Sequence, residues 1–277
     1  MRVEIICVNY FSATDVRKFV SSVLCAKNSE NVNILIVDNS CDEREFKHLS
    51  DISSINPEKI RVSNAGQNLG YFGASQLALD LIQKRQGEMP DYVIISNPDI
   101  VIAEDFFSQL KRVKSNSPVI GPKIISGRTG ENQNPYMINR PTRLRMQLYK
   151  WIFGILPVNF VYQYLSGLKQ ALFSFPKLDL PVDANTDSKV SYAIHGSFII
   201  FNRSYFTAGG NFKYGSFLFG EEIFVAETCL KLKLQIAYVP VLTVEHKEHV
   251  ATGLFPKLKT LRFISDSSRY CANMYFN

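Results

Sequence analysis

Short apolar runs alternate with helical patterns along the first 116 residues, and this alternation constrains the fold more than any other feature. Apolar, β-branched runs predict buried strands at 3–10, 32–40, 59–64 and 92–95. Helical spacing follows them at 12–26, 42–52, 69–87 and 104–116. The alternation predicts an α/β fold with an open, mostly parallel, Rossmann-like sheet and helices on both faces.

Polar residues stand at the ends of three of these strands. The run DYVIISNPDIVI at 91–102 is the clearest case, because its apolar strand ends in Asn97, Pro98 and Asp99 and the chain then turns apolar again. Asn9 and Asp38 end two other strands. Open α/β sheets bind ligands at the carboxyl ends of their strands, so we expect these groups to converge on one crevice. Taken alone, Asp99 is more often a turn residue, and Asp38 is equally ambiguous.

Two common nucleotide-binding motifs are absent from the sequence. No G-x-G-x-x-G follows the first strand, where VNYFSATD stands instead, and no G-x-x-x-x-G-K-[ST] occurs. Two acids at strand ends beside a glycine-flanked helix start at 68–70 could instead hold a nucleotide diphosphate and its divalent cation. Those glycines fit helix packing and turn formation equally well.

The second half of the chain is less regular. It holds a helical or amphipathic stretch at 139–175, a strand, turn and helix start at 190–206, a helix at 217–234 and a strand at 236–246. No repeat or low-complexity linker interrupts it. We therefore predict one domain, 1–277, with halves 1–116 and 117–277 and an insert at 139–175.

Composition is that of a globular protein, with 46% apolar and 20% charged residues. The net charge of +6 suits anionic ligands, a membrane surface or nucleic acid, and selects none of them. Five widely spaced cysteines without a CxxC predict the reduced thiols of a cytosolic protein. With no visible signal peptide and no apolar run of ~18 residues, we expect a soluble or peripheral protein.

Eight short motifs occur in an order and at a spacing that resemble a known family. They are VNY (8–10), IVDNS (36–40), NLGYFGASQLAL (68–79), ISNPDI (95–100), HGSFIIFNRSYF (195–206), GGNF (209–212), FLFGEE (217–222) and VPVLTVEH (239–246). Together they resemble a family-two bacterial glycosyltransferase of the GT-A fold, of the rhamnosyltransferase-like kind. The resemblance extends from residue 3 to about residue 250. It implies that 1–116 binds the nucleotide and that 117–277 binds the acceptor.

The resemblance implies a set of donor-binding residues. Asn9 and Tyr10 would border the nucleobase, and Asp38 would hydrogen-bond it. Asn68 and Gly70 would lie against the nucleotide-sugar. The full donor and acceptor set that it implies is Asn9, Tyr10, Asp38, Asn68, Gly70, Asn97, Gly196, Ser197 and Glu221.

The resemblance also implies a metal site and a base. Asp99 stands where relatives carry an Asp-x-Asp, so it would bind a divalent cation, Mg²⁺ or Mn²⁺, with His246 as a further ligand. Relatives carry a Glu-Asp pair on the late helix, and the Asp is the base. Here the pair is Glu221 and Glu222, so Glu222 takes the catalytic position, and Phe224 replaces a further acid of the relatives.

Two other roles for the histidines stay open. His246 and His249 form an H-x-x-H pair that could bind zinc, although no third ligand stands nearby. His195 is more often a packed or hydrogen-bonded residue than a catalyst.

The function implied is inverting transfer of a hexose or deoxyhexose. The donor would be a UDP- or dTDP-linked sugar, and the acceptor a hydroxyl of a glycan or polyprenyl-linked molecule in surface polysaccharide synthesis. A retaining mechanism would need a second nucleophile, which we do not identify. The alternative is a non-catalytic nucleotide-sugar-binding or scaffold protein, which Phe224 favours. A sugar nucleotidyltransferase would need a glycine-rich loop with a basic residue after the first strand, and NYFSATD lacks it.

Residues 140–157, RPTRLRMQLYKWIFGILP, have the composition of an interfacial segment. They carry four basic residues and no acid, followed by aromatic and aliphatic residues. The segment could contact a membrane surface, or it could pack on the core or on a second subunit of a homodimer. We expect a cytoplasmic protein, peripheral on the inner face of the plasma membrane, with no nucleic-acid partner.

Overall fold

The computed structural model describes residues 1–172, 188–248 and 257–277. The end of the predicted insert, 173–175, and His249 of the H-x-x-H pair lie outside the described residues. The strands are β1 (Val3–Asn9), β2 (Val32–Asp38), β3 (Ile60–Asn64), β4 (Tyr92–Ser96), β5 (Ile100–Ile102), β6 (Val119–Ser126), β7 (Lys189–Ser191), β8 (Phe198–Asn202) and β9 (Ile236–His246). The helices are α1 (Ala13–Cys25), α2 (Glu43–Ser53), α3 (Gly70–Gln86), α4 (Phe106–Leu110), α5 (Arg143–Gly154), α6 (Leu156–Leu172), α7 (Arg203–Thr207), α8 (Glu221–Lys231) and α9 (Leu258–Tyr275).

Among the described residues the strands form one nine-stranded sheet in the order β3-β2-β1-β4-β8-β6-β9-β5, with β7 paired to β9. The first four strands are parallel, as the sequence predicted. The second half is mixed, because β8 runs antiparallel to both β4 and β6 while β6 and β9 are parallel. The structure confirms the predicted α/β, GT-A-like fold class.

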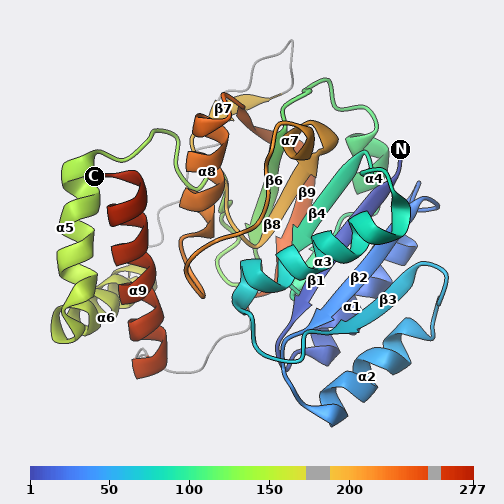
Figure 1. Ribbon diagram of the computed structural model, residues 1–277, viewed down its shortest axis with the longest axis horizontal. Helices are drawn as coiled ribbons and strands as arrows, with labels where there is room; N and C mark the ends of the chain where they lie inside the picture. The colour runs from blue at the N-terminus through green and yellow to red at the C-terminus, as the bar shows by residue number, and fades with distance from the viewer. Residues whose placement is uncertain (173–187, 249–256) are drawn as a thin grey trace.

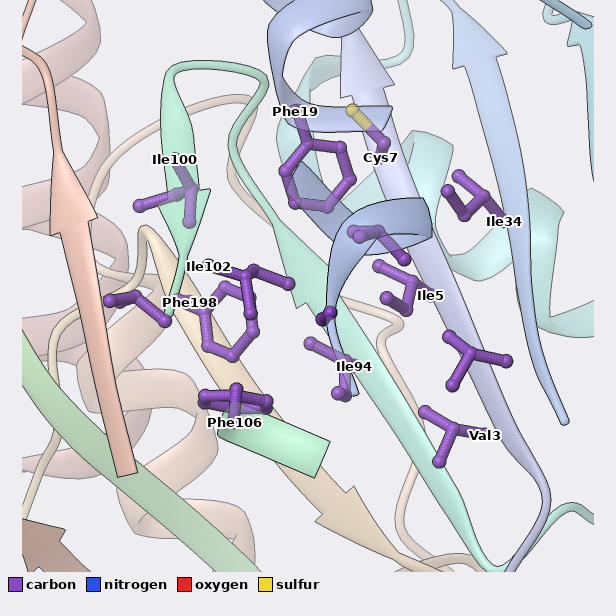
Figure 2. Packing of buried hydrophobic residues seen from close by; sticks show 14 of the residues in the cluster. Val3, Ile5, Cys7, Phe19, Ile34, Ile94, Ile100, Ile102, Phe106 and Phe198 are labelled. Atoms are coloured by element: carbon purple, nitrogen blue, oxygen red, sulfur yellow. The ribbon is translucent and has the colours of Figure 1, made fainter. Parts of the chain in front are cut away.

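Helices cover both faces of the sheet because successive side chains of a strand point to opposite sides. Ile5 and Cys7 of β1 pack with α1, α2 and α4, whereas Ile6 and Val8 pack with α3, α7 and α8. Figure 2 shows the first of these clusters, in which Phe19 of α1 lies over Cys7 and Ile5. The alternation buries β1 on both sides and so fixes where its carboxyl end lies.

The helices α5, α6 and α9 stand together at one end of the molecule, opposite β3 and α2 (Figure 1). α9 packs against α5, α6 and α8. Met146 of α5, Ile223 of α8 and Cys271 of α9 share one buried cluster. This three-helix unit is therefore attached to the sheet through α8. No helix among the described residues is long and apolar enough to cross a membrane.

Three elements differ from the sequence prediction. The helix predicted at 104–116 is only α4, because Val113 packs against the core and the chain then leads into β6. β6 was not predicted, and it is irregular between Pro122 and Lys123, where its register with β9 shifts. α9 was not predicted either, although its buried residues return at helical spacing.

Candidate active site

The end of β1 and the end of β2 are joined by side-chain hydrogen bonds. The Nδ2 of Asn9 donates to Oδ1 of Asp38 at 3.1 Å and to Oε1 of Glu45 at 3.0 Å. Asp38 accepts from the backbone N of Ser40 at 3.0 Å and from its Oγ at 2.9 Å. Asn9 and Asp38 are fully buried, so their side chains shape the loops that begin at these strand ends.

The exposed group at this strand end is an aromatic pair. Tyr10 and Phe11 follow β1 directly, and both rings are exposed. Their centroids lie 4.9 Å apart in an edge-to-face arrangement, and Phe11 has a φ of 54°. Of the predicted nucleobase neighbours, Tyr10 therefore has the surface that a flat ring could contact.

Asn39, which follows Asp38 at the predicted strand end, is buried and links β2 to α3. The Nδ2 of Asn39 donates to the carbonyl of Gly70 at 2.9 Å, and its Oδ1 accepts from the N of Leu69 at 3.2 Å. Asn68 accepts from the N of Gly70 at 3.0 Å. A Cβ added at Gly70 would lie 2.0 Å from the carbonyl oxygen of Phe217. Only glycine allows this close packing of the α3 start against the loop before α8.

The structure brings together the two predicted metal ligands. β5 pairs with the end of β9, so that Ile100 stands opposite His246. The Nε2 of His246 lies 3.3 Å from Oδ1 of Asp99, and the N of Lys247 donates to the carbonyl of Asp99 at 2.9 Å. The short apolar run after Asp99 thus serves to anchor this acid beside the histidine.

Hydrogen bonds behind His246 orient its ring. The Nε2 of Gln133 donates to Oε1 of Glu248 at 2.9 Å, and Ser126 donates to the other carboxylate oxygen. Because an ionised carboxylate only accepts, the amide oxygen of Gln133 must face His246, whose Nδ1 lies 2.9 Å away. A proton on Nδ1 would be donated to this oxygen, and Nε2 is the ring nitrogen that faces Asp99, at 3.3 Å.

This pair fits a divalent cation as two of its ligands. Adjacent corners of an octahedral site with bonds of about 2.1 Å are about 3 Å apart, close to the 3.3 Å between Asp99 and His246. Carboxylate oxygen suits Mg²⁺ and Mn²⁺, and imidazole suits transition metals. The described residues hold no cluster of three or more His, Cys, Asp and Glu that could bind a metal.

The turn before β8 lies beside Asp99 and His246. The N of Asn97 donates to the carbonyl of Ser197 at 2.8 Å, and Nδ1 of His195 lies 2.9 Å from the Ser197 hydroxyl. The His195 ring lies 5.8 Å from the His246 ring and 6.1 Å from the Tyr136 ring. His195 is therefore both hydrogen-bonded and packed, and it separates His246 from Tyr136.

Glu222 is held at the same turn. Its Oε1 accepts from the N of Gly196 at 3.1 Å, and the hydroxyl of Tyr71 donates to the Gly196 carbonyl at 3.1 Å. A Cβ at Gly196 would lie 2.9 Å from Oε1 of Glu222. Burial raises the pKa of Glu222, which strengthens it as a proton acceptor.

Glu221 has a different environment. It is buried, and its Oε1 has no hydrogen-bond partner. Burial, followed by the charge of Glu222, raises the pKa of Glu221 to about 8. Two adjacent carboxyls in this setting do not both ionise easily, although the N-terminus of α8 favours negative charge.

The acids of α8 and Asp99 affect the pKa values of nearby tyrosines. The charge of Glu222 is the main cause that raises the pKa of Tyr136, followed by burial. Burial raises the pKa of Tyr71, with further contributions from Glu221 and Asp99. Tyr136, Gln133 and Glu248 lie outside the motifs found in the sequence, because their roles arise from contacts between distant segments.

The nine-stranded sheet with helices on both faces is of the GT-A type. More particularly, residues 4–173 match the family model described as glycosyl transferase family 2, and the chain belongs to that family. The family part of the sequence prediction is confirmed. No curated protein sequence matches the chain.

Two solved structures extend the similarity. A structure of GalNAc-T7 with UDP, GalNAc and Mn²⁺ is similar with a TM-score of 0.61 and 13% identity, over 93% of this chain and 45% of that one. Residues 1–349 of TarS from S. aureus are similar with a TM-score of 0.53 and 13% identity, over 89% of this chain and 60% of that one. At this identity the likeness shows the fold alone, and the chain spans about half the length of these structures.

Proposed function

We propose that this chain transfers a hexose or deoxyhexose from a nucleotide-sugar, UDP- or dTDP-linked, to a hydroxyl of a glycan or polyprenyl-linked acceptor. A rhamnosyl-type donor is the specific form that the sequence motifs favour. The observation that carries the proposal is the grouping of Asp99 and His246, 3.3 Å apart, beside the turn that holds Glu222.

In the proposed reaction, Glu222 is the base. Its carboxylate accepts the proton of the acceptor hydroxyl while that oxygen bonds to the anomeric carbon. The bond from the same carbon to the diphosphate oxygen breaks, and the nucleotide leaves as its diphosphate. One such displacement inverts the anomeric centre. Tyr10 lies against the nucleobase, and the Asn39-supported start of α3 lies against the rest of the donor.

A divalent cation fits this scheme. Asp99 and His246 would hold it, and when bound it would neutralise charge on the diphosphate. The diphosphate group of the nucleotide-sugar would supply further oxygen ligands to the cation. GalNAc-T7, of similar fold, is described with UDP and Mn²⁺.

The proposed compartment is the cytoplasm, at the inner face of the plasma membrane, in surface polysaccharide synthesis. All five cysteines are free, as reduced thiols would be.

The non-catalytic alternative loses its main support at Phe224. That residue is 6% exposed and packs with Phe72 at 5.7 Å and Tyr214 at 5.3 Å between ring centroids. Position 224 therefore belongs to the core in this chain.

A thermal-shift panel of UDP-, dTDP- and GDP-sugars, with and without Mn²⁺, tests the donor class. Ligand at 100 times its dissociation constant stabilises the fold by about 2.7 kcal/mol. We expect one nucleotide class to stabilise the protein only with the cation. We expect Asp99→Ala to fold, to lose this dependence and to lose transfer. Full transfer by Asp99→Ala would overturn the assignment.

A further inference from the structure

One side of α5 is apolar and open to solvent. Leu144, Leu148 and Trp151 are spaced by four and three residues, which places them along one helix face, and exposed Ile155 follows the helix directly. Leu144 is 81% and Trp151 68% exposed. The opposite side of the helix carries Met146, which is buried against α9 and α8.

α6 presents a second stripe of the same kind. Val158, Val161, Tyr162 and Leu165 repeat at helical spacing, and all four are exposed. The helix is fixed in place by buried Asn159, whose Nδ2 donates to the carbonyls of Phe153 and Leu261, each at 3.1 Å. We call these eight exposed side chains the α5–α6 face.

Positive charge flanks this face. Relative to the stripe on α5, Arg145 lies about 100° to one side and Arg143 about 100° to the other. The ammonium of Lys150 is directed at α9, where it donates to Oδ1 of Asn273 at 2.7 Å. No acidic residue occurs from 143 to 166. Long basic side chains beside an apolar stripe can lay their stems along it and keep their charges at its border.

We propose that the α5–α6 face docks on an anionic lipid bilayer, with α5 lying in the plane of the interface. The apolar stripe enters the boundary between headgroups and acyl chains, and the flanking cations meet lipid phosphates. The proposal does not depend on the transfer reaction.

A second copy of the chain is a poorer occupant. In a two-fold dimer the same surface meets itself. Arg143 and Arg145 would then face their own copies, with no acid on either helix from 143 to 166 to offset them. Charge complementarity therefore favours an anionic partner over the chain itself.

Docking here would also fix the orientation of the active site. α9 packs on α5 and α6 at one side and on α8 at the other (Figure 1). α8 begins with Glu221 and Glu222. The bilayer would thus hold the acid pair at a set distance from the surface where a lipid-linked acceptor resides.

Trp151 makes the test direct because it is the only tryptophan of the chain. The protein is mixed with vesicles of phosphatidylcholine alone, or of equal parts phosphatidylcholine and phosphatidylglycerol. On the anionic vesicles at low salt we expect sedimentation with the vesicles, a blue shift of Trp151 emission and its quenching by brominated lipid. Raising the salt should weaken binding, because the Debye length shortens.

Two variants probe the two parts of the face. The double variant Leu144→Glu with Leu148→Glu removes apolar contact with the acyl chains. The double variant Arg143→Glu with Arg145→Glu should weaken binding to anionic vesicles by roughly fivefold for each cation lost at low salt. Ile55→Glu is the matched control, because Ile55 is an exposed apolar residue that follows α2 at the other end of the molecule. Circular dichroism verifies that each variant is folded.

Three results would overturn the proposal. The first is no binding of the native protein to anionic vesicles. The second is vesicle binding that leaves Trp151 emission unchanged and unquenched, which would assign docking to another surface. The third is a dimer by sedimentation velocity that Leu144→Glu with Leu148→Glu dissociates, which would make the face a subunit interface.

Discussion

At the residue scale, the two acids that begin α8 differ in their contacts. Adjacent residues of a helix point about 100° apart, so the two carboxyls cannot face the same substrate atom equally. Glu222 reaches the N of Gly196, and Glu221 Oε1 has no partner. We predict that Glu222→Gln lowers kcat by ~10²- to 10⁴-fold, because the amide keeps the shape but accepts no proton. Nucleotide affinity should change little, as steady-state kinetics and calorimetry can measure.

Glu221→Gln is the matched control for that prediction. It should lower kcat less than Glu222→Gln does, since Glu221 is not held at the Gly196 turn. Unchanged kcat in Glu222→Gln together with a large loss in Glu221→Gln would make Glu221 the base. If neither variant loses activity, the proton leaves by another route and the non-catalytic alternative gains support.

The raised pKa of Glu221 predicts how stability depends on pH. Its pKa rises from an ordinary 4.5 to about 8, so between these values the folded state holds a proton that the unfolded chain releases. The free energy of unfolding therefore falls as pH rises from about 4.5 to 8 and is level above that. Glu221→Gln removes this loss, so the variant should exceed the native protein in stability at pH 9.

The size of that effect follows from about 1.4 kcal/mol per pKa unit. A difference of a few kcal/mol at pH 9, shrinking towards zero near pH 5, is expected in urea titrations. Exposed Glu58→Gln should show no such trend. If Glu221→Gln changes the free energy of unfolding by the same amount at pH 5 and at pH 9, burial does not raise the pKa of this carboxyl.

The sequence could predict part of the site for a physical reason. His246 is the last residue of β9, and Asp99 lies in the short turn between β4 and β5, so each follows an apolar run that delivers it to the sheet edge. Gln133 and Tyr136 lie in an irregular segment after β6, where no periodicity marks them. Their contacts with His246 and His195 exist only once the sheet has formed.

At the scale of elements, the start of α3 depends on a glycine. Gly70 has a φ of 73°, and a Cβ there would overlap the carbonyl oxygen of Phe217. Gly66 has nearly the same φ, 72°, with nothing within 4 Å of an added Cβ. We predict that Gly70→Ala destabilises the protein by about 1–3 kcal/mol more than Gly66→Ala, because only Gly70→Ala adds a steric overlap to the backbone strain.

Denaturant titration of the two variants measures this difference in the free energy of unfolding. Both substitutions place alanine at a positive φ, so subtracting the Gly66→Ala value leaves the cost of the steric overlap at Gly70. Gly70→Ala should also weaken nucleotide binding, because the α3 start can no longer close against the loop before α8. Equal stability of the two variants would mean that the Phe217 segment moves away at no cost.

The strands differed in how well the sequence predicted them. β1, β2 and β4 were clear because apolar, β-branched side chains fill both of their faces. β6 was hidden by Gly121, Pro122 and Lys123, which its irregular pairing with β9 accommodates. The antiparallel direction of β8 follows from pairing with β4 and β6 across the sheet, which no local pattern encodes.

At the scale of the whole molecule, Arg140 adds polar contacts to the packing that joins the three-helix unit of α5, α6 and α9 to α8. Arg140, just before α5, donates to both carboxylate oxygens of Glu227 on α8, at 2.7 and 3.1 Å. It also donates to the carbonyl of Tyr275 at 2.8 Å and lies over the Phe276 ring at 4.4 Å. Arg140 therefore joins α8 to the end of α9.

We predict that Arg140→Ala loosens this unit. The change leaves Glu227, whose side chain is only 10% exposed, without two charge-assisted hydrogen bonds, at a cost of about 1–3 kcal/mol. Because one link between α8 and the end of α9 is then lost, hydrogen exchange should speed up at 258–275 and not in β1 or β4. Arg203→Ala is the control, since its pair with Asp91 is half-exposed on both sides and should cost at most about 1 kcal/mol. If exchange in α9 is as slow in Arg140→Ala as in Arg203→Ala, the buried cluster of Met146, Ile223 and Cys271 holds the unit without the arginine.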